Sequence, residues 1–219
     1  FSNFYNYHTG FLVCAVLTIF GFISFYACSY KEMNKRLSFK VLKKFTITKQ
    51  SEQNKNLVKG YTAHCIELFG MWAWMPVFLS LVLIGKTGLN PIILGLVISI
   101  TLHITGVFAN MISGVFSDKF GSKNVLIIFA FISSIFSFLM GWIPSLSWLI
   151  ILLISFLYSF FTIGDSGVLT AALTDSTNRN VLGRSLAYRS IIGIGFGSIT
   201  PGIFGFILDI FSYCFDYRK

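Results

Sequence analysis

The stretch Gly114-Val-Phe-Ser-Asp118-Lys-Phe-Gly121-Ser-Lys123 is a short polar segment between two long apolar runs. It holds one acid, two lysines and two glycines. A run of about 20 apolar residues is long enough to cross a hydrocarbon core about 30 Å thick. We therefore expect this segment to be a loop that joins two membrane-spanning helices.

The composition of the whole chain is that of a membrane protein. Of its 219 residues, 55% are hydrophobic and 11% are charged, whereas soluble domains carry about 25% charged residues. The formal net charge is +9, and the basic residues are concentrated between Lys31 and Lys59. Because this block lies between apolar runs, we interpret it as positive charge retained in the cytoplasm and not as a nucleic-acid surface. The chain begins with Phe1, so we expect a fragment or a processed product.

The apolar runs predict an all-α, polytopic transmembrane helix bundle of about six spans. The predicted spans are Phe11–Tyr30, Thr62–Ile84, Pro91–Val115, Asn124–Ile143, Ser147–Leu173 and Ser185–Ile210. When the spans alternate in direction, the three basic connections fall on one side, which is then cytoplasmic. The predicted organisation is a span over residues 1–30, a basic cytoplasmic loop over 31–60, a bundle over 61–212 and a tail over 213–219.

Ionisable residues inside a span are costly, so each one is a candidate functional residue. His64 and Glu67 are three residues apart and share a helix face, and Trp74 lies on roughly that face again. Pro76 is expected to kink the span. An acid and aromatic residues beside a kink are typical of a substrate or proton site. The alternative is that His64 and Glu67 are solvated at the lipid headgroups, with Trp72 and Trp74 in an interfacial belt.

Two further candidates lie in other spans. Asp165 has glycines at positions 164 and 167, so backbone and neighbouring helices are able to approach it closely. The alternative is a buried acid that Ser166 caps or that pairs with a basic group on another helix. His103 stands alone among apolar residues, and here the alternative to a functional role is a packed, hydrogen-bonded histidine.

The last predicted span is rich in glycine. Gly193 and Gly197, and likewise Ser198 and Gly202, are four residues apart, and small residues at that spacing allow helices to pack backbone to backbone. Pro201 adds a flexible point. The predicted packing or gate positions are Gly193, Gly197, Pro201, Gly202 and Gly205.

Signatures of enzymes are absent from the sequence. No metallopeptidase, serine-hydrolase or nucleotide-binding motif occurs, and the four cysteines lack the spacing of a metal site or a disulfide framework. We expect no enzymatic activity, no metal and no cofactor, beyond coupling to H⁺ or another ion. The expected surroundings are a lipid bilayer and a small-molecule solute, with no nucleic acid.

These features together resemble the major facilitator superfamily of secondary transporters. Gly114-x-x-x-Asp118-Lys-x-Gly121-x-Lys123 is similar to the family's cytoplasmic loop signature, G-x-x-x-D-R/K-x-G-R-K. Ser122 stands where a basic residue is usual. This departure resembles the weaker copy of the signature, which lies between spans 8 and 9.

Other segments strengthen the resemblance. The segment from His64 to Pro76 is similar to span 7 of a subset of the family, and the segments that begin at Asp165 and at Gly193 are similar to spans 10 and 11 of bacterial members. The chain then corresponds to spans 6 to 11, and an N-terminal half of the transporter is an expected partner. The resemblance implies a multi-pass protein of the bacterial inner membrane.

The resemblance implies secondary active transport of a small solute by alternating access. Glu67 would couple protons or contact the solute, Trp72 and Trp74 would line the cavity, and Asp165 would pair or relay charge. The candidates for the solute or proton site are Glu67, His64, Trp72, Trp74, Asp165 and His103.

The loop signature would act as a cytoplasmic gate. Its expected residues are Gly114, Asp118, Lys119, Gly121, Lys123 and Arg184. Arg184 is expected to pair with the acid of the loop. Two alternatives stay open: a non-transporting relic of a truncated gene, and a polytopic membrane assembly factor or enzyme.

Overall fold

The computed structural model of the chain describes residues 52–216, together with the isolated positions 16, 19 and 23. The chain divides into two units, Phe1–Lys49 and Gln50–Lys219, and the helix bundle is the second of them. The predicted span Phe11–Tyr30 and residues 31–51 of the predicted basic loop lie outside the described residues.

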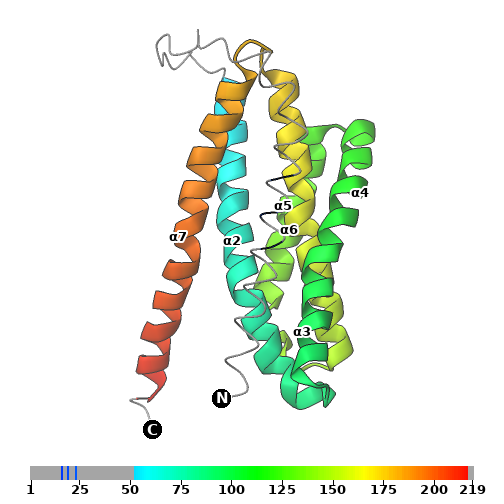
Figure 1. Cartoon of the computed structure of the whole chain (residues 1–219), viewed down its shortest axis with the longest axis vertical. Coiled ribbons are helices and arrows are strands. Elements are labelled where there is room, and N and C mark those ends of the chain that lie inside the picture. Colours follow the sequence, from blue (N-terminus) through cyan, green and yellow to red (C-terminus); the bar gives the residue numbers. More distant parts are fainter. Residues whose placement is uncertain (1–15, 17–18, 20–22, 24–51, 217–219) are drawn as a thin grey trace. The chain divides into compact units, whose positions relative to one another are not determined.

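The described part of the chain is built from helices (Figure 1). They are α2 (Glu52–Thr87), α3 (Pro91–Ser99), the π-helical turn η1 (Ile100–Ile104), α4 (Thr105–Phe120), α5 (Ser122–Leu139), the 3₁₀ turn η2 (Ile143–Ser145), α6 (Trp148–Ser176) and α7 (Leu182–Asp216). Since α3, η1 and α4 form one continuous segment, residues 52–210 contain 5 helical segments long and apolar enough to cross a membrane. This confirms the all-α prediction for the described residues, and the five segments match in position the five predicted spans that follow the first.

The polar segment from Gly114 to Lys123 is helical, and the prediction of a loop there is wrong. Helix α4 continues to Phe120 and α5 begins at Ser122, so the turn consists of Gly121 alone. Its φ of 84° is a conformation that favours glycine. The hydroxyls of Ser117 and Ser122, 2.9 Å apart, join the two helix ends. The polar residues of this segment therefore lie at the exposed ends of two helices and not in a loop.

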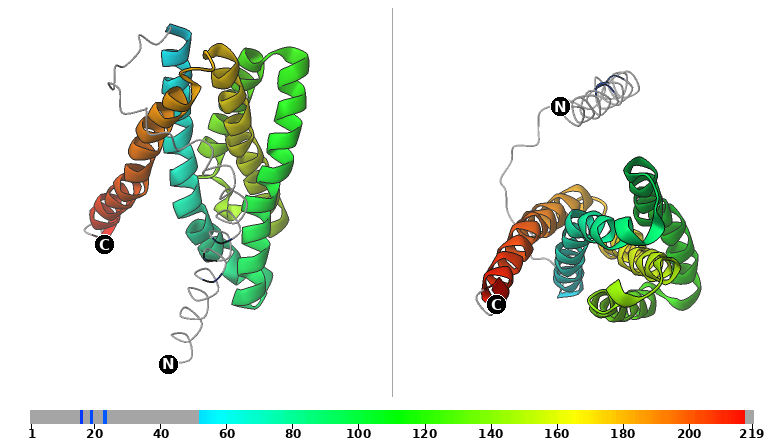
Figure 2. Two further views of the ribbon diagram at one scale, coloured as in Figure 1. Left: turned by 45° about the horizontal axis from the view of Figure 1, so that its top comes forward. Right: turned by 90° about the horizontal axis from the view of Figure 1, so that it is seen from below.

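Helix α6 is the central helix of the bundle. It packs against α2, α4 and α5, whereas α7 packs mainly against α2 and lies beside it at the edge of the end-on view in Figure 2. Helix α2 begins at Glu52, earlier than the predicted span. At that end the buried Asn54 side chain donates to Thr177 at 3.0 Å and accepts from Ser176 at 2.9 Å. At the opposite end Lys86 donates to the carbonyl of Leu146 at 2.7 Å.

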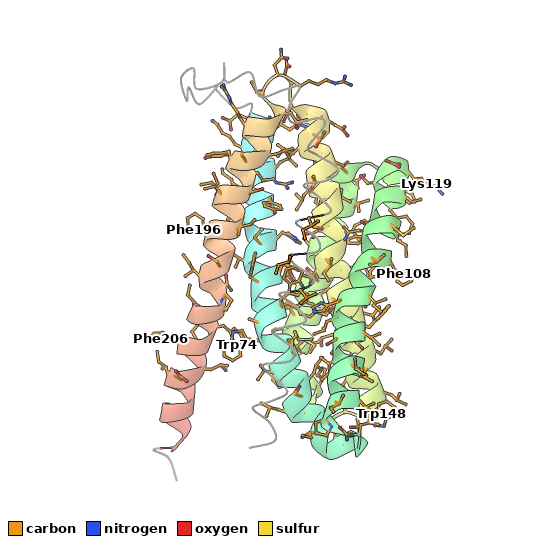
Figure 3. All side chains as sticks on the ribbon, viewed as in Figure 1. Trp74, Phe108, Lys119, Trp148, Phe196 and Phe206 are labelled. Atoms are coloured by element: carbon orange, nitrogen blue, oxygen red, sulfur yellow. The ribbon has the colours of Figure 1, made fainter. Side chains whose placement is uncertain are left out.

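Large apolar side chains lie both inside the bundle and on its outer surface. Leu79, Leu83 and Ile151 are fully buried between α2 and α6. Figure 3 shows Phe108, Phe196 and Phe206 projecting outward from α4 and α7. Apolar residues exposed over every helix would promote aggregation in water. They suit an acyl-chain environment instead, as expected for a membrane protein.

Glycines allow α7 to pack closely on α2. A Cβ added at Gly193 would lie 2.5 Å from the ring of Tyr61, and one at Gly197 would lie 2.7 Å from Phe69. Gly205 likewise lies against Trp74. A Cβ at Gly202 would have no atom of the described residues within 4 Å. The spacing Gly193/Gly197 is thus used in the α2–α7 contact, whereas the pair Ser198/Gly202 is not.

Alanine at two glycines of α7 tests this contact. Gly197→Ala places a methyl group 2.9 Å from the backbone carbonyl oxygen of Cys65, and such overpacking destabilises by roughly 1–3 kcal/mol. We expect a lower midpoint of thermal unfolding in detergent. Gly202→Ala is the matched control and should leave the midpoint unchanged or raise it, because alanine favours helix over glycine. Equal midpoints for the two variants would contradict the packing described.

Candidate functional site

Helices α2 and α6 run antiparallel and meet along a line of polar side chains. Residues three or four apart on one helix share a face. The polar residues of α2 have this spacing, and because the helices are antiparallel, their partners on α6 follow in the opposite order along the chain. We call this line the polar ladder, and its rungs are His64–Asp165, Glu67–Thr162 and Met71–Ser159. The predicted shared face of His64 and Glu67 is present and points at α6.

The first rung is a buried pair of ionisable side chains. Nδ1 of His64 lies 2.7 Å from Oδ1 of Asp165, and the side chains are 2% and 12% exposed. Neither atom has a hydrogen-bond partner elsewhere among the described residues, so each depends on the other. Of the alternatives left open for Asp165, the structure therefore shows the contact with a basic group on another helix.

Glu67 forms the second rung. The Thr162 hydroxyl donates to its Oε1 at 3.2 Å. The Ser133 hydroxyl of α5 shares its proton between Oε2 of Glu67 at 3.4 Å and the carbonyl oxygen of Ala130 at 3.1 Å. Glu67 lies about 22 Å along α2 from the helix start, at 1.5 Å per residue. It is half-buried and has no ion pair within residues 52–210. Its two oxygens are therefore bonded to neutral hydroxyls deep in the bundle.

The glycines beside Asp165 bring α4 and α5 close to α6. A Cβ at Gly164 would lie 2.6 Å from an aromatic ring of α5, and a Cβ at Gly167 would lie 2.9 Å from Oδ1 of Asn110 on α4. That oxygen accepts hydrogen bonds from the Gly167 amide and the Ser166 hydroxyl, both at 3.2 Å. Ser166 thus donates a hydrogen bond to Asn110 on α4. These contacts hold α6 in the rotation in which Asp165 faces α2.

Arg189 on α7 is a buried cation that the reading of the sequence did not single out. It is 8% exposed. Its guanidinium carbon lies 4.0 Å from the ring centroid of Tyr61, and Nη1 donates to the Thr170 hydroxyl at 2.9 Å. Nε has no partner, and no carboxylate pairs with the side chain within residues 52–210. The sequence could have indicated Arg189 as a candidate functional residue, since it is a charged residue inside a predicted span.

The tryptophans have different surroundings. Trp74 donates its indole N–H to the carbonyl of Pro201 at 3.1 Å, so it contacts α7 while Glu67 contacts α5 and α6. Trp72 is 42% exposed and meets the ring of His103 edge-on, with centroids 6.5 Å apart. His103 is itself exposed and lies in the π-helical turn. Among the described residues, neither tryptophan hydrogen-bonds to the side chains of the polar ladder or has a ring contact with them.

The signature residues lie at the end of the bundle where α4 ends and where α2 and α7 begin, which we call the basic end. Figure 3 labels Lys119 there. Asp118, Lys123 and Arg184 are exposed. The ion pairs of residues 52–210 do not join Asp118 to Arg184. A Cβ added at Gly114 would meet no atom of the described residues within 4 Å. The structure thus places these residues at one end without bringing the acid to the arginine.

No group of three or more His, Cys, Asp and Glu side chains suited to a metal ion occurs in the part of the chain that the structure describes. No family model, curated protein or solved structure matches the chain.

A double-mutant cycle tests the pair of His64 and Asp165. Breaking a buried pair by removing one partner costs roughly 3–5 kcal/mol, so Asp165→Asn and His64→Gln should each lower the unfolding midpoint in detergent. Their combined effect should be smaller than the sum, by roughly 0.5–3 kcal/mol for residues in contact. His103→Gln is the control, because the exposed His103 should show no coupling to Asp165→Asn. Additive effects of His64→Gln and Asp165→Asn would contradict the pairing.

Proposed function

We propose that this chain is the C-terminal part of a secondary active transporter of the major facilitator type, in a bacterial inner membrane. It would move a small solute by alternating access, together with an N-terminal half. The observation that carries the proposal is the polar ladder, which places two acids and a histidine between apolar helices. Ionisable residues in such a place commonly belong to ion or proton pathways.

Glu67 is the residue we assign to proton coupling. A carboxylate bonded to the hydroxyls of Thr162 and Ser133 can gain or lose a proton without breaking an ion pair. A hydroxyl is both donor and acceptor, so both hydroxyls are able to bind either form of the acid. The three residues come from three helices, and a shift of α2 against α5 or α6 would change the groups around the carboxylate.

Arg189 supplies a second charged element. Burying a charge without a counter-charge is expensive, so the presence of Arg189 at the α2–α7 contact favours a role in function over one in stability. Thr170, which binds Arg189, lies on the same helix as Asp165. In our proposal Arg189 is an alternative partner for Asp165 when movement of α2 separates Asp165 from His64.

The exposed residues fit the same proposal. Trp72 and His103 present an aromatic and polar surface available to the solute or to the N-terminal half. Asp118, Lys119 and Lys123 at the basic end would form the gate, and Arg184 would reach the acid in another state of the transport cycle. Such a gate would have an open and a closed state, so its contacts would break and form as the two halves of the transporter move.

Replacement of Glu67 by glutamine tests proton coupling. In the protein expressed from its complete reading frame and reconstituted in liposomes, a pH-sensitive dye reports proton movement when sugars, amino acids, carboxylates or inorganic anions are added. Glu67→Gln should abolish solute-dependent proton movement, because the amide cannot carry the proton. Glu52→Gln on the same helix changes an exposed acid and should have no effect. Equal proton movement in both variants, or no dependence on any solute, would contradict the proposal.

Arg189→Met separates function from stability. The change removes an incompletely paired buried charge and keeps an apolar stem, and such replacements are often neutral or stabilising. We therefore expect an unfolding midpoint equal to or above that of the parent, together with a loss of uptake of roughly tenfold, within the usual range of coupling between sites. Arg179→Met, at an exposed position, is the control for loss of charge. A fall in stability with uptake retained would assign Arg189 a structural role.

A further inference from the structure

A pocket of about 510 Å³ lies between α2 and α7 near the ends at which both helices begin. Its wall includes Lys55 and Lys59 of α2, followed by Ile66. Helix α7 contributes Tyr188 and Ile192. None of these residues belongs to the polar ladder, so the pocket is separate from the site described above.

The wall of the pocket changes from charged to apolar along the helices. Lys55 and Lys59 are one turn apart, and Ile66 lies about 10 Å further along α2 at the helical rise. Helices α2 and α7 both start at the basic end (Figure 1), so Tyr188 also precedes Ile192 in this direction. The cations are thus nearest the aqueous phase, and the aliphatic side chains lie deeper along the spans.

The charge of the pocket is positive. Lys55 pairs with Glu52 at 2.7 Å, but both side chains are exposed, at 49% and 82%, and exposed pairs contribute little. Lys59 has no ion pair within residues 52–210. Glu52 is not part of the wall, and no acidic residue of the described part of the chain lines it. An anionic group at this end of the pocket would therefore be attracted by two lysines and repelled by no carboxylate in the wall.

We infer that this pocket binds an anionic phospholipid. The phosphate would lie between Lys55 and Lys59, and an acyl chain would pass Ile66 and Ile192. A small soluble anion would make no use of the aliphatic part, and an apolar peptide segment would make no use of the lysines. The position agrees with lipid recognition, because basic side chains where helices enter a membrane attract anionic headgroups. The inference does not rest on the proposed transport function.

Photolabelling with a defined lipid tests the inference. The full chain is reconstituted in nanodiscs of phosphatidylcholine that contain phosphatidylglycerol with a photoreactive group in its acyl chain, and labelled peptides are identified by mass spectrometry. We expect labels on the segments around Ile66 and Ile192. Unlabelled phosphatidylglycerol should reduce the labelling, whereas additional phosphatidylcholine should not.

Two matched pairs of lysines separate this pocket from general surface charge. The double variant Lys55→Gln/Lys59→Gln should lower labelling of the pocket by roughly tenfold or more, since each lysine near a membrane surface contributes about fivefold to anionic-lipid binding. The control Lys119→Gln/Lys123→Gln removes the same charge at the same end of the bundle, outside the pocket wall, and should leave labelling unchanged. Equal losses in the two double variants would overturn the inference.

A third variant tests the apolar part of the pocket with all charges retained. Ile66 is 41% exposed, so we expect the fold to tolerate Ile66→Trp and the indole ring to occupy the pocket. We expect it to lower labelling while the unfolding midpoint stays unchanged. Unaltered labelling would overturn the inference.

Competition identifies the occupant. If oleate or inorganic phosphate competes while phosphatidylglycerol does not, the pocket takes a free anion and the phospholipid is excluded. If lipid labelling is absent and an amine-reactive cross-linker joins Lys59 to residues 1–49, the chain's own preceding segment occupies the pocket. Either result overturns the inference.

Discussion

A carboxylate among apolar helices must be paired with another polar side chain, and the arrangement of this bundle depends on that constraint. Asp165 is paired with His64, and Glu67 with two hydroxyls, along the contact of α2 with α6. A slip of one residue along either helix rotates its side chains by about 100° and would separate every rung. The polar ladder therefore fixes the rotation and register of two helices that apolar packing alone would define less sharply.

Helix α2 uses two different kinds of contact on its two sides. Towards α6 it presents ionisable and polar side chains, which specify partners by hydrogen bonding. Towards α7 it presents Tyr61, Phe69 and Trp74, which pack on glycines. Because hydrocarbon chains are as apolar as leucine, close packing is a main source of association between helices in a membrane. Arg189 lies at the second contact and is bonded to Thr170 of α6, so it connects the two.

Apart from the buried Arg189, the lysines and arginines of the described residues are exposed and lie near the ends of the helices. Most exposed lysines and arginines of the described residues lie at one end of the bundle, near the starts of α2, α5 and α7, whereas Lys86 lies at the opposite end. There they are available to water, to lipid headgroups or to acidic side chains. Only Gly121 separates α4 from α5, which keeps Lys119 and Lys123 on neighbouring helix ends. The proposed gate and the proposed lipid pocket thus occupy the same end, and they share α7, which carries Arg184 of the gate and Tyr188 and Ile192 of the pocket.

The amino-acid sequence by itself determined the helical, multi-pass character, because runs of about twenty apolar residues have few other stable structures in lipid. It also indicated His64, Glu67 and Asp165, since ionisable residues stand out in such runs. Only the tertiary structure decided which of them meet. Helix periodicity predicts which residues of a helix share a face, but not which helix packs against that face. Trp74 therefore contacts α7, although its spacing from Glu67 placed the two residues on roughly the same face. The same limit hid the surroundings of Arg189, whose contacts come from Tyr61, far earlier in the chain, and from the preceding helix.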